Sequence, residues 1–172
     1  MRDIWFISDT HFDHANMLKF TGDEGNPIRP GFTDVNHMNE VMIENWNSRI
    51  KPGHLVWHLG DFAFGNKTIV SRLLKQLHGK KRLVVGNHDK IKEVAPYFEK
   101  VVLWRIFKEF NFTCSHIPLR KEQMRKTRFN VHGHIHQNVM EDTDYINMCV
   151  EHTNYTPVHM DEVIAEIKRR EG

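Results

Sequence analysis

Five short apolar segments of this chain each lead, directly or after a single glycine, into an aspartate, asparagine or histidine, and this repeated arrangement restricts the fold more than any other feature. The segments are Ile4 to Ser8, Leu55 to Leu59, Arg82 to Val85, Phe112 to Ser115 and Phe129 to His132. Most of them have the length and the Val, Ile, Phe and Trp content of strands that are buried on both faces. A sixth segment, Tyr145 to Val150, has the same character.

Helical patterns separate these expected strands. Asp34 precedes apolar residues that recur at three- and four-residue steps from Val35 to Ile50, and Asp34 is a suitable N-cap. Further helices are expected from Lys67 to Leu77 and from about Met160 to Arg170. Strands that alternate with helices predict an α/β fold. Because the chain shows no internal repeat or linker, we expect residues 1–172 to form a single domain.

The polar residues that follow the strands form one set of candidate metal ligands. They are Asp9, His11, Asp61, Asn87, His116, His134 and His136. Ligands of open α/β sheets bind beyond the carboxyl ends of the strands, so these side chains are expected to converge. Glycines directly precede Asp61, Asn87 and His134, where they would let the backbone turn sharply.

The chemistry of this set favours borderline divalent metal ions. Two carboxylates, one carboxamide and four imidazoles without a thiolate suit Mn, Fe, Zn, Ni or Co better than an oxygen-only calcium site. Seven ligands are too many for one ion and fit two ions, with Asp61 as the natural bridge. Each motif taken alone is more readily explained by an ordinary turn or strand end than by a metal site. Their joint occurrence at successive strand ends favours a shared metal centre.

These motifs resemble the five sequence blocks of the calcineurin-like metallophosphoesterase superfamily. The blocks are Asp9-Thr10-His11, Gly60-Asp61, Gly86-Asn87-His88-Asp89, His116 and Gly133-His134-Ile135-His136. Stretches around Glu44 to Asn47, His58 to Gly65 and Asn154 to Val158 are similar to a compact branch found in bacteria and their phages. The resemblance implies a four-layer α/β/β/α sandwich in which two mixed β-sheets are flanked by helices.

The resemblance also implies how the ligands divide and what they do. Asp9, His11 and His136 would bind one metal and Asn87, His116 and His134 the other, with Asp61 between them. His88 would face the scissile phosphate, and we expect Asp89 to orient it. The implied activity is phosphodiester hydrolysis by a metal-bridging hydroxide, with manganese as the first choice of metal. A phosphomonoesterase and a non-catalytic metal-stabilised binding module remain alternatives.

Three further features are candidates for substrate binding. His14 could meet a substrate phosphate or be a surface histidine, and Arg29 could clamp a phosphate with its guanidinium. A basic run at residues 120–128 could overhang the site or be a solvated loop.

Composition limits the partners and the location. The 24 Lys and Arg residues nearly balance the 22 Asp and Glu residues, so we expect a small phosphoester or nucleotide substrate and no stable nucleic-acid complex. There is no apolar run of about 20 residues and no signal peptide, so we expect a cytoplasmic protein without a membrane span. Of the 13 histidines, His58 and His132 lie inside strands, where we expect either a hydrogen-bonded core position or a residue that supports a metal ligand. Cys114 and Cys149 are expected to be small buried hydrophobes.

Overall fold

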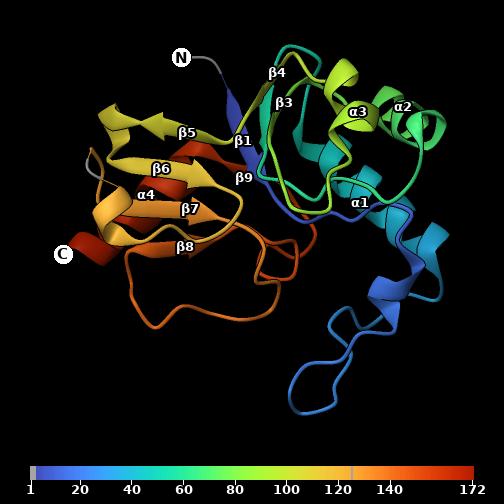
Figure 1. Ribbon diagram of the computed structural model, residues 1–172, viewed down its shortest axis with the longest axis horizontal. Coiled ribbons are helices and arrows are strands. Elements are labelled where there is room, and N and C mark those ends of the chain that lie inside the picture. Colours follow the sequence, from blue (N-terminus) through green and yellow to red (C-terminus); the bar gives the residue numbers. More distant parts are fainter. Residues whose placement is uncertain (1–2, 125) are drawn as a thin grey trace.

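The computed structural model describes residues 3–124 and 126–172, and it contains two mixed β-sheets flanked by helices (Figure 1). Sheet I has the strand order β4-β3-β2-β1-β9, and sheet II has the order β5-β6-β7-β8. The strands of sheet I are β1 (Ile4–Ile7), β2 (Leu55–His58), β3 (Lys80–Val84), β4 (Lys100–Val102) and β9 (Val158–His159). Those of sheet II are β5 (Trp104–Phe107), β6 (Phe112–Ser115), β7 (Phe129–His132) and β8 (Tyr145–Asn147). The predicted α/β architecture is confirmed.

Strand direction places the strand ends of each sheet together. Strands β1 to β4 are parallel, whereas β9 runs antiparallel to β1. In sheet II, β6, β7 and β8 are parallel, and β5 is antiparallel to β6. In each sheet, the loops that follow the parallel strands therefore lie together at the carboxyl ends of those strands.

In residues 3–124 and 126–172, the α-helices are α1 (Val35–Arg49), α2 (Lys67–Gln76), α3 (Ile91–Val94) and α4 (Met160–Glu171). The Asp34 side chain caps α1 by accepting the backbone N–H groups of Asn36 and His37. Asn66 caps α2 in the same way. His159 and Glu162 form a capping box at the start of α4. Among the described residues, no helix is long and apolar enough to cross a membrane.

Alternate residues of β1 face two different apolar cores. Ile7 packs with residues of α1 and α2, whereas Phe6 packs with residues of sheet II such as Phe112. Helix α4 contributes Met160 to the same core as Phe6. A strand that contributes to two cores is usually rich in apolar residues, and all four residues of β1 are apolar, which is why the sequence pattern revealed it.

The structure contains strands that the sequence pattern did not indicate. β4, β5, β9 and the short α3 fall outside the predicted segments. All three strands lie at sheet edges, where one side of the strand is not hydrogen bonded and mixed polar and apolar residues are tolerated.

The strand predicted from Tyr145 to Val150 ends earlier than expected in sheet II, because the chain then crosses from sheet II to sheet I. β8 ends at Asn147, after which Cys149 bridges to Ser8 at the end of β1. The backbone N–H of Ser8 donates to the Met148 carbonyl over 3.0 Å, and that of Val150 donates to the Ser8 carbonyl over 3.2 Å. This crossing joins the two sheets next to the loops that follow β1 and β7.

Candidate metal centre

The candidate ligands follow the carboxyl ends of five parallel strands that come from both sheets. Asp9 and His11 follow β1, Asp61 follows β2 and Asn87 follows β3. The remaining candidates follow strands of sheet II: His116 comes after β6, and His134 and His136 come after β7.

The structure brings all seven side chains together in two adjoining groups. The ligand atoms of Asp9, His11 and His136 lie within 4.8 Å of one another, and so do those of Asp61, His116 and His134. Asn87 belongs to the second group, since its Oδ1 lies 2.8 Å from His116 Nε2 and 2.9 Å from His134 Nδ1.

Asp61 lies between the two groups. Its Oδ2 is 3.6 Å from His11 Nε2 in the first group and 3.4 Å from His116 Nε2 in the second. Its Oδ1 accepts the backbone N–H of His88 over 2.8 Å. Burial opposes ionisation of Asp61, but hydrogen bonding and attraction to His116 hold its pKa at about 2. The carboxylate is therefore ionised at neutral pH.

Two buried atoms in the first group have no hydrogen-bond partner among the described residues. They are Asp9 Oδ1 and His11 Nε2. Burial lowers the pKa of His11 to about 2, so the ring is neutral and Nε2 can offer a lone pair. Leaving a buried acceptor unpaired is costly, and a divalent cation would satisfy both atoms. The residues present therefore fit a bound metal.

Strained backbone is concentrated at the same residues. Asp9, His11, Asp61, His134 and His136 have positive φ angles of 56°, 47°, 56°, 75° and 48°. Residues with a side chain adopt this left-handed conformation rarely and at a cost in free energy. Such outliers cluster where a functional geometry is imposed by the surrounding structure.

Two glycines allow the loops to approach each other closely. A Cβ atom on Gly86 would collide with the backbone nitrogen and Oδ1 of Asp61. A Cβ atom on Gly133 would collide with Ser8 Oγ and Asp9 Oδ2. The absence of a side chain at both positions is therefore a condition for placing the two carboxylates.

Asp9 is held by contacts from three segments. Its Oδ2 accepts Ser8 Oγ over 2.5 Å and the backbone N–H of His134 over 2.9 Å. The Cys149 thiol also donates to Oδ2, over 3.2 Å, and burial raises the pKa of this thiol so that it keeps its proton. Cys149 is buried as predicted, but it has a polar role that the sequence did not indicate. Cys114 is buried in the core between the sheets, as predicted.

His88 lies beside the ligand groups with its side chain exposed. Its ring is 5.6 Å from that of His11, measured between centroids. Asp89 does not orient it, contrary to the prediction. The Asp89 carboxylate instead accepts the backbone N–H groups of Asp61, Phe62 and Gly86 over 3.0, 2.9 and 2.8 Å. It therefore fixes the two loops that carry Asp61 and Asn87.

Arg29 also differs from its prediction, because its side chain is fully buried and its guanidinium binds groups of the protein. Nη2 and Nη1 donate to the carbonyls of Asp9 and Thr10 over 2.5 and 2.9 Å. Nε donates to Glu151 Oε1 over 2.8 Å, and this same oxygen lies 3.1 Å from His136 Nδ1. Arg29 thus holds both the strained loop after β1 and the carboxylate that orients His136.

Glu151, which contacts both Arg29 and His136, is a residue of the site that the sequence pattern did not indicate. Burial opposes its ionisation, but its contacts with His136 and Arg29 hold its pKa at about 2. An acidic residue directly after the apolar run that ends at Val150 is the signal that could have revealed it.

The histidines inside strands occupy hydrogen-bonded core positions, as predicted. His58 Nδ1 accepts the backbone N–H of Gly60 over 3.2 Å, so Nε2 carries the proton that it donates to Thr10 Oγ1 over 2.9 Å. Thr10 in turn donates to the Phe62 carbonyl. This chain of bonds joins the loops after β1 and β2. His132 Nδ1 donates to the Gly133 carbonyl over 2.8 Å.

Two cations of the basic run, Lys121 and Arg128, pair with carboxylates away from the ligands. Lys121 pairs with Asp142 and Asp144, and Arg128 pairs with Asp144. Arg128 precedes β7 and Asp144 precedes β8, so these pairs lie at the opposite ends of the strands from the ligands. Arg125 lies outside the described residues.

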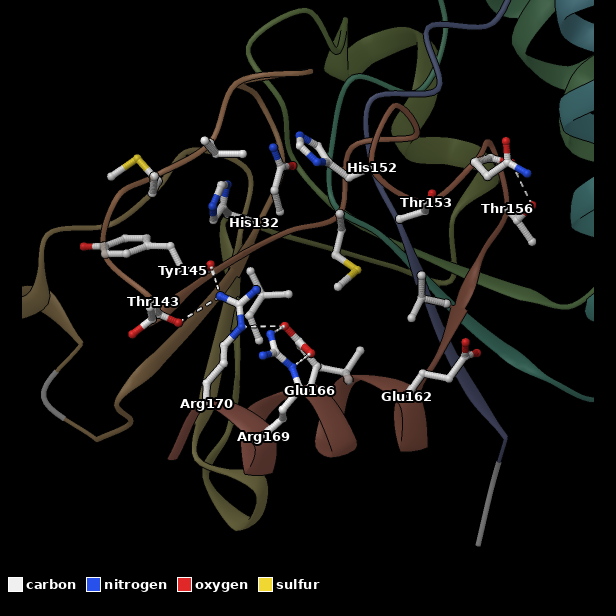
Figure 2. A pocket seen from close by; sticks show the side chains of 18 of the residues that line it. His132, Thr143, Tyr145, His152, Thr153, Thr156, Glu162, Glu166, Arg169 and Arg170 are labelled. Carbon is white, nitrogen blue, oxygen red and sulfur yellow. Dashed lines mark hydrogen bonds and ion pairs between the residues drawn. The ribbon is translucent and has the colours of Figure 1, made fainter. Parts of the chain in front are cut away.

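A separate groove of about 990 Å³ runs between β8, β9 and α4 (Figure 2). Arg170 donates to the carbonyls of Thr143 and Tyr145 and pairs with Glu166 there. His132 lines the groove, but none of the seven candidate ligands does. Its charged groups are largely engaged with one another, so the ligand groups remain the candidate functional site.

We predict that Gly86→Ala lowers the free energy of unfolding by about 1–3 kcal/mol, because the added methyl group overpacks the contact with Asp61. Gly53→Ala is the matched control, since a Cβ atom at Gly53 meets nothing within 4 Å. Urea unfolding of both variants and the unmodified protein measures the difference. Equal stability of the two variants would contradict the close contact.

Comparisons with known proteins show relatives over most of the chain and a similar fold. The chain is 33% identical to an uncharacterized protein of Methanocaldococcus jannaschii over 98% of this chain and 93% of that protein. It is 25% identical to the gene 66 protein of Mycobacterium phage D29 over 83% of each chain. The crystal structure of a protein of unknown function from Aquifex aeolicus superposes with a TM-score of 0.73, at 29% identity over 95% of this chain and 98% of that one.

A family model described as the calcineurin-like phosphoesterase superfamily domain matches residues 2–151. This range contains all seven candidate ligands as well as His88. The match covers most of the chain and agrees with the resemblance of the five sequence blocks. The chain therefore belongs to the calcineurin-like phosphoesterase superfamily.

Proposed function

We propose that this chain is a phosphodiesterase that uses two divalent metal ions, most readily manganese, within a single domain. The observation that carries the proposal is the position of Asp61 Oδ2, which lies 3.6 Å from His11 Nε2 and 3.4 Å from His116 Nε2, between two groups of ligand atoms. The unpaired buried atoms Asp9 Oδ1 and His11 Nε2 support it further.

The ligands would divide as the two groups do. Asp9, His11 and His136 would hold one ion, Asn87, His116 and His134 the other, and Asp61 both. The bound metal pair would supply an activated water molecule and neutralise charge on the phosphoryl oxygens. The chain's own contribution is to keep these ligands in place through the strained loops, Asp89 and the Arg29–Glu151 pair.

His88 would act on the substrate rather than on the metals. Its backbone is fixed by the hydrogen bond to Asp61, while its imidazole is exposed beside His11 and makes no hydrogen bond to a described residue. The ring is free to donate a proton to a phosphoryl oxygen or to the leaving oxygen. His14 lies in the same region, with its Nδ1 3.3 Å from His11 Nδ1.

The placement of the basic residues favours a diester over a monoester. A phosphomonoester carries more negative charge than a diester, and additional arginine or lysine groups commonly neutralise it. Arg29 and Lys121, two cations predicted near the phosphate, are both engaged in ion pairs, and Lys90, two residues after His88, would add one positive charge near the substrate. A small phosphodiester with a single negative charge therefore suits this site better.

Hydrolysis of bis-p-nitrophenyl phosphate and of p-nitrophenyl phosphate by the manganese-loaded protein tests the proposal. We expect the larger kcat/KM for the diester and loss of both activities after treatment with a chelator. A preference for the monoester would identify a phosphatase with the same site. Bound metal without turnover of either substrate would identify a binding module and contradict the proposal.

His88→Ala is expected to keep both metals and to lower kcat by about 10²–10⁴-fold, the usual contribution of a general acid or base. Turnover of the diester and elemental analysis of the same sample measure the two properties. His37→Ala, which changes a histidine at the start of α1, should leave both unchanged. Full turnover by His88→Ala would refute the assigned role.

Asp61→Ala is expected to lose metal occupancy and activity together, because the substitution removes a ligand from both ions. Elemental analysis after equilibration with excess manganese measures the number of ions per chain. Two metals per chain in this variant would show that Asp61 does not bridge them.

Glu151→Gln is expected to weaken binding of one of the two ions by about 10–100-fold, as loss of a carboxylate that orients a metal-bound histidine usually does. Its contact with His136 Nδ1 is the reason, and titration with manganese measures the two affinities separately. Glu162→Gln, which breaks an exposed pair with Arg49, is the matched control. Equal affinities in the two variants would contradict this role for Glu151.

A further inference from the structure

A series of aromatic rings leads from the candidate metal centre to the surface. The His11 and His14 ring centroids are 5.3 Å apart. His14 in turn stacks on Phe64, with 4.4 Å between the centroids and 12° between the planes. Phe20 meets His14 edge-on at 6.1 Å.

The outer members of the series are exposed, although folding favours burial of phenylalanine. Phe64 is 48% exposed and Phe20 is 45% exposed. Burying an aromatic side chain contributes strongly to stability, so two exposed phenylalanines that both contact His14 suggest ligand binding beside the site.

The backbone fixes Phe64 relative to the candidate ligands. Its N–H donates to the Phe12 carbonyl over 2.8 Å, next to the bridge between Phe12 and Ala63. Phe12 follows His11 directly, and the backbone N–H of His14 donates to the His11 carbonyl over 3.1 Å. These hydrogen bonds hold His14 and Phe64 on two loops that are bonded to each other next to His11.

Lys90 places a positive charge beside the exposed Phe64 ring. Lys90 Nζ lies 5.4 Å from the centre of the Phe64 ring, and Lys90 follows His88 by two residues. An ammonium group over an aromatic ring beside a phosphoryl site suits a ligand that has both a planar ring and a negative charge. Nucleotides combine these two groups, whereas a glycerol or choline phosphodiester lacks the ring.

We propose that His14, Phe64 and Lys90 form a shelf on which the nucleobase of a nucleotide phosphodiester stacks while its phosphate lies at the metal centre. Phe20 borders the shelf. This inference rests on the proposed phosphodiesterase function and specifies its substrate class. Phe64 is the specificity-determining residue, because it offers the most exposed ring of the shelf.

Two chromogenic diesters that share a leaving group separate base recognition from hydrolysis. They are thymidine 5′-(p-nitrophenyl phosphate) and methyl p-nitrophenyl phosphate, assayed with the manganese-loaded protein. Phe64→Ala is expected to raise KM about tenfold for the thymidine diester, as loss of one stacked base contact does, and to leave KM for the methyl diester within about twofold. Phe64→Tyr should keep the thymidine KM.

Trp104→Ala is the matched control, because Trp104 on β5 is an aromatic residue with 57% exposure and does not belong to the shelf. It should change neither KM. If Phe64→Ala altered both substrates equally, or neither, the shelf would be refuted.

Binding measured by calorimetry provides a second readout that does not need turnover. The manganese-loaded protein should bind AMP more tightly than ribose 5-phosphate, and Phe64→Ala should remove most of this difference. If the unmodified protein hydrolysed neither diester, the proposed function would fail, while the difference in binding would still decide whether the shelf exists. Equal binding of AMP and ribose 5-phosphate by the unmodified protein would overturn the inference.

Discussion

The pairing of Ser8 with residues 148–150 is the contact on which the arrangement of the site depends. It joins sheet I to sheet II at the point where β1 ends, through backbone hydrogen bonds on both sides of Ser8. The next residue, Asp9, extends this junction by accepting the backbone N–H of His134. Ligand loops from two separate sheets consequently meet at one place, and seven candidate ligands converge although they are spread over 128 positions of the chain, from residue 9 to residue 136.

The same region carries an energetic cost that the rest of the molecule offsets. Five candidate ligands have left-handed backbone, and two of their polar atoms are buried without a partner. Strain of this kind costs of order 1–3 kcal/mol per residue and persists where surrounding contacts impose it. Here those contacts are the Arg29 guanidinium on two carbonyls of the loop after β1 and the Asp89 carboxylate on three backbone N–H groups. Metal binding would recover part of this cost by satisfying Asp9 and His11.

The sequence predicted the parts of the fold whose burial leaves a pattern. β6 and β7 have the bounds that were expected, and all four residues of each strand are buried. The edge strands β4, β5 and β9 were missed, since half-exposed segments carry no such pattern. The grouping of the candidate ligands also followed from the sequence, because a parallel strand places the residue after it at a known edge of the sheet.

Residue type alone did not reveal which partner a charged side chain has. Arg29 and Asp89 were assigned to the substrate and to His88, yet both are buried and bind backbone groups of the ligand loops. Glu151 was missed for the same reason, as its partners Arg29 and His136 are 122 and 15 residues away in the chain. Such contacts depend on the tertiary fold rather than on local spacing.

The central claim is that these two groups of side chains bind a pair of metal ions that share Asp61. A crystal structure of the protein grown with manganese, with an anomalous difference map collected near the manganese edge, tests it most directly. The account predicts two peaks, one among Asp9, His11 and His136 and one among Asn87, His116 and His134, both in contact with the Asp61 carboxylate. A single peak, or two peaks of which one is out of reach of Asp61, would contradict it.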